Sequence, residues 1–274
     1  MVKNVEDIRS GIIVTVFSTA SAVGKTLLSI NLAAELANQS YKVCVVDLDL
    51  QFGDVCNYLH IVPKKTIYDC QKAAATDEAM IVHDYISTYK ADQVELDVLA
   101  SPLQIDEAYN ISTPAIVAVL SKLRQNYDYI VLDTAAAFSD LNLAVMDLST
   151  IITFVGIVDF IPTIKNMKVG YDTMRSIGYE QNKIRFVLNR SNSKTHIELQ
   201  DVEQLLEERF YHVLPNDFAT AIDSVHTGIP LVISSKHTVL SRSLQELVAK
   251  YTNRMQTGKE NKGSLSNWFK QIFS

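Results

Sequence analysis

Short apolar runs alternate with amphipathic segments along most of this chain. The runs are rich in β-branched residues and end at polar or turn-forming residues, so they predict buried strands. The predicted strands are residues 11–17, 42–50, 96–102, 127–133, 151–157, 183–189 and 211–215.

Helical spacing of apolar residues fills much of the chain between these runs. The predicted helices are residues 27–36, 114–124, 162–177, 198–208 and 217–226, with shorter turns into helices at 51–59 and 63–69. Residues 71–93 are mixed and interpreted as mostly helical. Alternating strands and helices indicate an α/β fold: a doubly wound, mainly parallel sheet with helices on both faces.

Domain boundaries follow from composition. Neither an internal repeat nor a long linker divides residues 1–254, which we expect to form one domain. Residues 255–264 are polar and predict a linker. Residues 265–274 place Leu265, Trp268, Phe269, Ile272 and Phe273 on one face of a helix two turns long. Such a short helix needs a surface to fold on, either a membrane or the domain itself.

The first predicted strand leads through a short loop into Gly24-Lys25-Thr26 and a helix. A helix N-terminus presents unpaired N–H groups to an anion, Lys25 can reach outer phosphates, and the Thr26 hydroxyl can bind Mg²⁺. These features predict a Walker A phosphate loop and a P-loop NTPase fold. The alternative is a chance occurrence of three residues, because Thr19 occupies the position where the general pattern has glycine.

Carboxylates end two of the predicted strands. Asp47 and Asp49 follow an apolar run, and Asp133 ends another, as in a Walker B strand that holds Mg²⁺ through water. Ligands of parallel sheets gather at the carboxyl ends of strands, so these acids are expected to face what Lys25 holds. Solvated strand-end acids are the alternative for Asp47 and Asp49. Residues 135–140 are expected to form a mobile loop near the γ-phosphate.

Bulk properties narrow the class of protein. The chain has 274 residues, 47% of them hydrophobic, and it lacks a secretory signal pattern or a spanning run. Its three widely spaced cysteines fit reduced thiols in the cytosol better than disulfides or a zinc site. The net charge is −6, but residues 236–274 hold seven Lys/Arg and two Glu. An acidic body with a basic tail disfavours a broad DNA-binding face.

The motifs together resemble the MinD/ParA-type ATPases with a deviant Walker A motif, K-G-G-x-G-K-[ST]. Within that group the chain is most similar to the TadZ/CpaE branch, which positions Flp/Tad pilus assembly machinery. The narrower similarity lies in residues 46–54 (VDLDLQFGD), 187–190 (VLNR), 214–217 (LPND) and 228–231 (GIPL).

This resemblance implies ATP and Mg²⁺ as cofactors and a set of site residues. Lys25 and Asp49 would be catalytic, with Asp49 orienting the attacking water. Thr26, Asp47 and Asp133 would form the metal site. The residues expected to bind the nucleotide are Ser21, Ala22, Val23, Gly24, Lys25, Thr26, Leu27, Asn189, which would recognise the adenine edge, and Pro215.

Two departures from the family pattern affect the expected activity. Ala20 stands where the family has its signature lysine, and Ser21-Ala22 replaces the double glycine. Loss of a trans cation costs roughly 10³–10⁵-fold in rate, by analogy with arginine fingers. We therefore expect a weak ATPase that still binds ATP.

The resemblance also implies partners and a location. We expect a cytoplasmic homodimer bound peripherally to the inner face of the membrane, through anionic lipid and residues 265–274, with pilus or other polar machinery as partner. The alternatives are a MinD-like division-site or flagellar-placement ATPase and a non-hydrolysing membrane-site scaffold. DNA is an unlikely partner.

Overall fold

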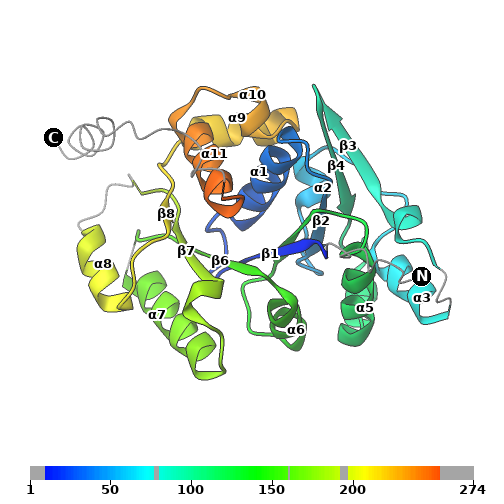
Figure 1. The fold of residues 1–274 in the computed structure, drawn as a ribbon, viewed down its shortest axis with the longest axis horizontal. Helices are drawn as coiled ribbons and strands as arrows, with labels where there is room; N and C mark the ends of the chain where they lie inside the picture. Colours follow the sequence, from blue (N-terminus) through cyan, green and yellow to red (C-terminus); the bar gives the residue numbers. More distant parts are fainter. Residues whose placement is uncertain (1–9, 77–79, 160, 192–196, 254–274) are drawn as a thin grey trace, which may run out of the picture.

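The computed structural model describes residues 10–76, 80–159, 161–191 and 197–253. Within them one sheet has the strand order β3-β4-β2-β5-β1-β6-β7-β8 (Figure 1). The strands are β1 (Ile12–Phe17), β2 (Val43–Leu48), β3 (Ser87–Ala91), β4 (Val94–Leu99), β5 (Tyr129–Thr134), β6 (Ile151–Gly156), β7 (Ile184–Leu188) and β8 (His212–Val213). All neighbouring strands are parallel except β3 and β4. The predicted doubly wound, mainly parallel sheet is confirmed.

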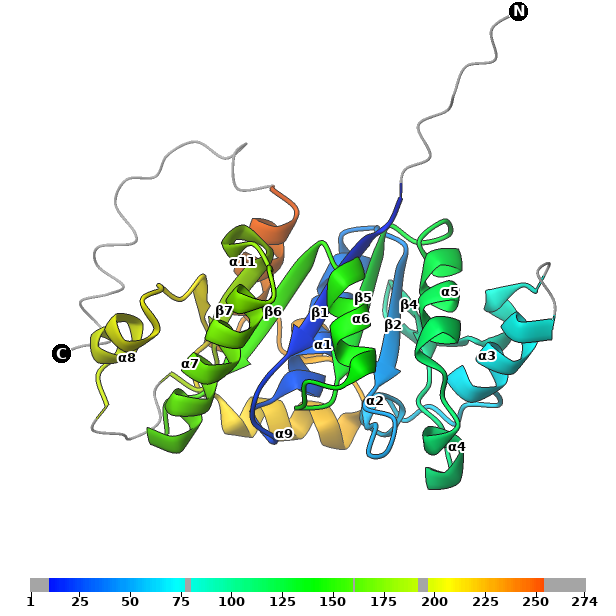
Figure 2. The ribbon, with the colours of Figure 1, turned by 90° about the horizontal axis from the view of Figure 1, so that it is seen from below.

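Helices cover both faces of this sheet, as Figures 1 and 2 show. The helices are α1 (Lys25–Asn38), α2 (Val55–Tyr58), α3 (Ile67–Thr76), α4 (Ile105–Tyr109), α5 (Thr113–Leu123), α6 (Asp140–Leu148), α7 (Ile161–Ser176), α8 (Leu199–Leu206), α9 (Phe218–Thr227), α10 (Leu231–Ser234) and α11 (Val239–Tyr251), with 3-10 turns η1 (Val82–Tyr85) and η2 (Gln181–Lys183). In the described part of the chain, none is long and apolar enough to cross a membrane.

The expectation of mostly helical structure over residues 71–93 is wrong in its second half. There β3 forms an antiparallel hairpin with β4, and Asp92 adopts a left-handed φ of 51° in the turn. Of the five β3 residues only Tyr89 is buried, so this edge strand has little of the apolar alternation that predicts strands. Pairing with β4, which is set by the rest of the sheet, decides its conformation.

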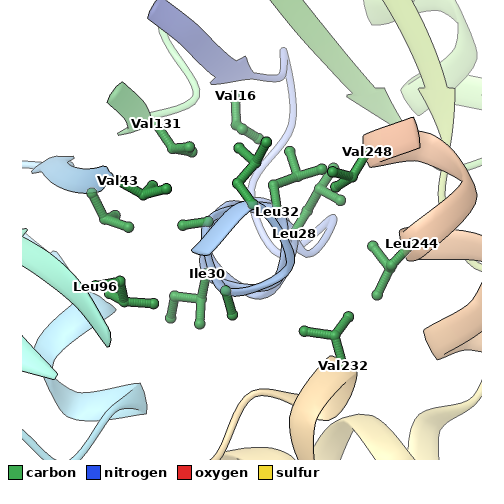
Figure 3. Close-up of a cluster of buried hydrophobic side chains, with 14 of the residues drawn as sticks. Val16, Leu28, Ile30, Leu32, Val43, Leu96, Val131, Val232, Leu244 and Val248 are labelled. Atoms are coloured by element: carbon green, nitrogen blue, oxygen red, sulfur yellow. The ribbon is translucent and has the colours of Figure 1, made fainter. Parts of the chain in front are cut away.

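Helix α1 is the central element of the core on its side of the sheet. Leu28, Ile30 and Leu32 are almost fully buried, and Figure 3 shows them between sheet residues such as Val131 and side chains of α10 and α11. Every α1 residue from Leu28 to Ala37 is buried, polar ones included, unlike a surface helix that buries one apolar stripe. This packing fixes the position of the α1 N-terminus, where the candidate site lies.

Candidate functional site

The candidate site lies at the carboxyl edge of the central strands. Strand β5 lies between β1 and β2, and in register Asp133 pairs with Val16 on one side and Asp47 on the other. The loop that follows β1 ends at the start of α1, and Figure 2 shows α2, α4 and α9 along the same edge. The fold therefore brings together the segments that the sequence singled out.

The loop between β1 and α1 is shaped for an anion. Gly24 has φ 94° and caps α1 without a side-chain hydrogen bond, so the first N–H groups of the helix have no side-chain acceptor at the cap. Ala22 also adopts a left-handed φ, 58°, at a position where the deviant Walker A motif has glycine. Left-handed backbone costs a residue with a Cβ about 1–2 kcal/mol. The loop therefore adopts this turn although alanine at residue 22 disfavours it.

Asp133 is buried beneath this loop and linked to α1. Its Oδ2 accepts a 2.7 Å hydrogen bond from the Thr26 hydroxyl, and its Oδ1 accepts one of 2.9 Å from the Ser29 hydroxyl. Burial raises the pKa of Asp133 to about 6, against the lowering effects of these two hydrogen bonds and of the Lys25 charge. Ser29 was not predicted; its only signal is a hydroxyl one turn after Lys25 in an apolar helix.

The two strand-end acids of β2 occupy different environments. Asp47 is buried and accepts hydrogen bonds from the N–H groups of Asp49 and Val55, both 3.2 Å, and from the Ser101 hydroxyl, 3.3 Å. Its pKa is raised well above the usual value, first by burial and then by the charge of Asp133. Asp49 is half-buried and lines the cavity described below.

Gly53 explains part of the sequence around these acids. A Cβ at this position would lie 2.1 Å from Ser101 Oγ and 2.5 Å from Asp47 Oδ2. The loop can therefore pass this close to the Asp47 carboxylate only with glycine at residue 53. Packing therefore explains the glycine in residues 47–54, a segment whose acids were singled out for their chemistry.

A cavity of about 790 Å³ opens above the loop. Its lining includes every residue predicted to bind the nucleotide except one, namely Ser21, Ala22, Gly24, Lys25, Thr26, Leu27, Asn189 and Pro215. The exception, Val23, is buried and turns its carbonyl toward Asn189. Asp47 and Asp133 are buried and do not belong to this lining.

Asn189 and Arg190 hold the loop from the end of β7. The Asn189 side-chain Nδ2 donates to the Val23 carbonyl at 2.8 Å, and its Oδ1 accepts from the Arg190 N–H at 2.9 Å. Arg190 Nη2 donates to the Ala22 carbonyl at 3.1 Å. Asn189 therefore fixes the loop between β1 and α1, and its recognition of adenine stays a prediction.

Exposed apolar side chains surround the cavity on one side. Phe52 lies in the loop shortly after Asp49. One face of α9 carries three more at helical spacing, Phe218, Ile222 and Val225. Phe52 and Phe218 are 72% and 65% exposed, far more than is usual for phenylalanine. Grouped apolar residues of this kind mark a surface that contacts another molecule. Sequence periodicity predicted helix α9 but not that its apolar face is uncovered.

Comparison with known proteins gives a family and several relatives. Residues 14–228 match the model of the CobQ/CobB/MinD/ParA nucleotide binding domain. The chain is 35% identical over 130 residues to the sporulation initiation inhibitor protein Soj of Bacillus subtilis, an alignment of 45% of this chain and 49% of that one. It is 23% identical over 248 residues to the septum site-determining protein MinD of Thermotoga maritima, with 86% of each covered.

Solved structures share the fold. A ParA family ATPase from Chlorobium tepidum superposes with a TM-score of 0.80 at 17% identity, over 88% of this chain and 98% of that one. MinD from Pyrococcus horikoshii, solved in complex with Mg-ADP, superposes with a TM-score of 0.75 at 19% identity, over 88% and 96%.

Proposed function

The chain belongs to the CobQ/CobB/MinD/ParA nucleotide-binding family, and we propose that it is an ATP-dependent positioning protein of the TadZ/CpaE type. One observation carries the ATP-binding part of this proposal. The Thr26 hydroxyl at the start of α1 donates to the buried Asp133 carboxylate at the end of β5, 2.7 Å away. Phosphate loop and Walker B carboxylate are thereby joined where a Mg²⁺–phosphate group is held in P-loop proteins.

The residues present fit a Mg²⁺-nucleotide. The uncapped α1 N-terminus and Lys25 supply positive charge for phosphate oxygens, and Thr26 with Asp133 supplies oxygen atoms for the metal. No cluster of three His, Cys, Asp or Glu suited to a metal occurs among the described residues. Mg²⁺ typically binds through one or two carboxylates and substrate phosphates. A bound Mg²⁺ would neutralise charge on the outer phosphates, while Asp47 holds the loop that follows β2 through the N–H groups of Asp49 and Val55.

We propose that hydrolysis is slow. Asp49 lines the cavity and is the residue proposed to orient the attacking water. Ala20, half-buried before the turn at Ala22, brings no charge to the place where negative charge develops during phosphoryl transfer. ATP binding depends on Lys25, Thr26 and the helix N-terminus, so it should suffer less than turnover.

The bound state is proposed to be a homodimer that assembles over the cavity. The exposed Phe52 and the apolar face of α9 border the cavity, so a second copy placed there would bury them together with the nucleotide. Nucleotide binding would then control dimerisation, which is how a protein with slow turnover still acts as a switch.

Residues 265–274, which lie outside the described part of the chain, are proposed to form the amphipathic anchor that binds the dimer to the inner face of the membrane. Two copies of a short basic and aromatic segment bind far better than one, because the second contact becomes intramolecular. The protein would thus be cytoplasmic and peripherally membrane-bound, with pilus or other polar machinery, rather than DNA, as its proposed partner.

A second candidate is division-site placement. It is favoured by the Thermotoga maritima MinD relative, which aligns over 86% of this chain and 86% of its own length. Both candidates use the same site residues, so they differ only in the machinery that is positioned.

One experiment tests the shared proposal. Calorimetry with Mg²⁺ and a slowly hydrolysed ATP analogue, together with turnover assays with and without anionic vesicles, measures binding, hydrolysis and membrane coupling. Wild-type protein that shows no saturable nucleotide binding would exclude the proposal. Localisation of a fluorescent fusion to a pole or to the division site then separates the two candidates.

A further inference from the structure

Arg190 reaches the phosphate loop from the far side of the cavity. It directly follows Asn189 at the carboxyl end of β7, and its Nη2 donates to the Ala22 carbonyl at 3.1 Å. Ala22 is the loop residue with left-handed backbone, two positions before Gly24. Arg190 therefore contacts the turn of the loop and belongs to the lining of the cavity.

The backbone at Arg190 is itself strained. Its φ is 55°, in the left-handed region that residues with a Cβ avoid. The Asn189 side chain holds it there, because its Oδ1 accepts the Arg190 N–H at 2.9 Å while its Nδ2 grips the Val23 carbonyl. Strain that the surroundings enforce is concentrated at functional sites. Here it directs the arginine toward the loop instead of away from the domain.

The charges around the cavity suggest what the guanidinium does. Among the described residues that line it, the cations are Lys25 and Arg190, and the acids are Asp49, Asp54 and Asp217. A nucleoside triphosphate brings several negative charges into this acidic surrounding. Lys25 and one Mg²⁺ do not balance them all, and Ala20 contributes none.

We propose that Arg190 binds the outer phosphates of the nucleotide and is the second positive charge of the site. Its planar fork can contact the Ala22 carbonyl through one N–H group and phosphate oxygens through others. The inference rests on the proposed ATP-binding function. It adds a binding residue that distinguishes a triphosphate from a diphosphate.

The test compares two substitutions with a matched control. Arg190→Gln removes the charge and Arg190→Lys keeps it without the fork. Arg185→Gln makes the same change within β7, before Arg190; the Arg185 guanidinium lies 4.9 Å from the Tyr211 ring centre, outside the cavity lining. Affinities for a slowly hydrolysed ATP analogue and for ADP are measured by calorimetry with Mg²⁺.

We expect Arg190→Gln to weaken binding of the ATP analogue by about tenfold or more and of ADP by less than about threefold, the scale of one charge-assisted contact. Arg190→Lys should have an affinity for the ATP analogue between those of the wild type and Arg190→Gln. Arg185→Gln should change neither affinity. Equal losses for both nucleotides would mean that Arg190 only shapes the loop, and no loss would mean that it does not bind phosphate; either overturns the inference. A wild-type protein that binds neither nucleotide would instead refute the proposed function.

Discussion

Thr26 and Asp133, 107 positions apart in the chain, are joined by a hydrogen bond of 2.7 Å between hydroxyl and carboxylate. Thr26 is the second residue of α1 and Asp133 lies near the end of β5, so the contact exists only because β5 pairs with β1. It ties the phosphate loop to the acidic edge of the sheet. Binding, hydrolysis and metal use are all expected to depend on this junction.

The first prediction concerns nucleotide binding. Lys25→Ala should reduce affinity for Mg²⁺ and the ATP analogue by at least about tenfold, because a buried cation for the phosphates is lost. Asp133→Asn should weaken binding chiefly in the presence of Mg²⁺, since it removes the metal's carboxylate. Calorimetry with and without Mg²⁺ measures both. Lys42→Ala, an exposed lysine before β2, is the control; equal affinity in wild type and Lys25→Ala would contradict the prediction.

The second prediction concerns turnover. Ala20→Lys should raise the rate of ATP hydrolysis by an order of magnitude or more, because a cation is restored where phosphoryl-transfer charge develops. Ala20→Gln, similar in length but neutral, should leave the rate unchanged. Steady-state phosphate release provides the measurement. The opposite result would be rapid ATP hydrolysis by the wild type, with no increase in Ala20→Lys. That result would show that another cation, such as Arg190, already stabilises the charge of phosphoryl transfer.

The third prediction uses the strained loop residue. Ala22→Gly should stabilise the fold by about 0.5–1 kcal/mol. Glycine adopts φ 58° without the Cβ penalty, and its greater conformational entropy in the unfolded state offsets part of that gain. Ser21→Gly, at the neighbouring residue without a positive φ, should be neutral or destabilising. Urea unfolding of the nucleotide-free proteins measures the difference. A loss of stability in Ala22→Gly would show that the turn is not strained.

The fourth prediction concerns acid stability. His212 is buried, with Nε2 2.9 Å from Ser243 Oγ and Nδ1 3.1 Å from Lys250 Nζ. Burial, followed by the Lys250 charge, lowers the pKa of His212 to about 4. The folded state then binds fewer protons than the unfolded state between that value and about 6.5, the usual histidine pKa. Stability should be full above this window and fall as pH decreases through it, by about 2 kcal/mol from pH 7 to 5.

Urea unfolding at several pH values tests this dependence. His212→Gln should flatten the curve across the window, while His226→Gln, at an exposed residue of α9, should not. Identical curves for wild type and His212→Gln would show that other groups control acid stability.

The fifth prediction concerns the tail. Trp268 fluorescence should shift to the blue on addition of anionic vesicles and not of neutral ones, because the aromatic face enters the acyl boundary while lysines meet headgroups. Phe269→Glu should abolish the shift, and Lys270→Gln should weaken it. A tryptophan that is already blue-shifted and protected from quenchers without lipid would mean that the segment packs on the domain.

Local patterns in the sequence predicted most of the sheet and the charged groups at its edge. The strands at residues 11–17, 42–50 and 127–133 and the helix from residue 27 are confirmed within a few residues by β1, β2, β5 and α1. The apolar runs of these strands are nearly continuous because both faces of a central strand are buried, so the signal lies in each segment itself. Lys25, Thr26 and Asp133 could be named as candidates because their motifs are contiguous in the chain.

Only the tertiary structure decided the features that depend on residues far apart in the sequence. Strand β3 has too few buried positions for its own sequence to predict a strand, and it forms by pairing with β4. The hydrogen bonds from Ser29 to Asp133 and from Arg190 to the Ala22 carbonyl join segments more than 100 residues apart, and the uncovered face of α9 depends on what packs beside it. A side chain's partners are set by the crossovers of the chain, which local propensity does not encode. The sequence therefore determined which groups are present, and the fold determined which of them meet.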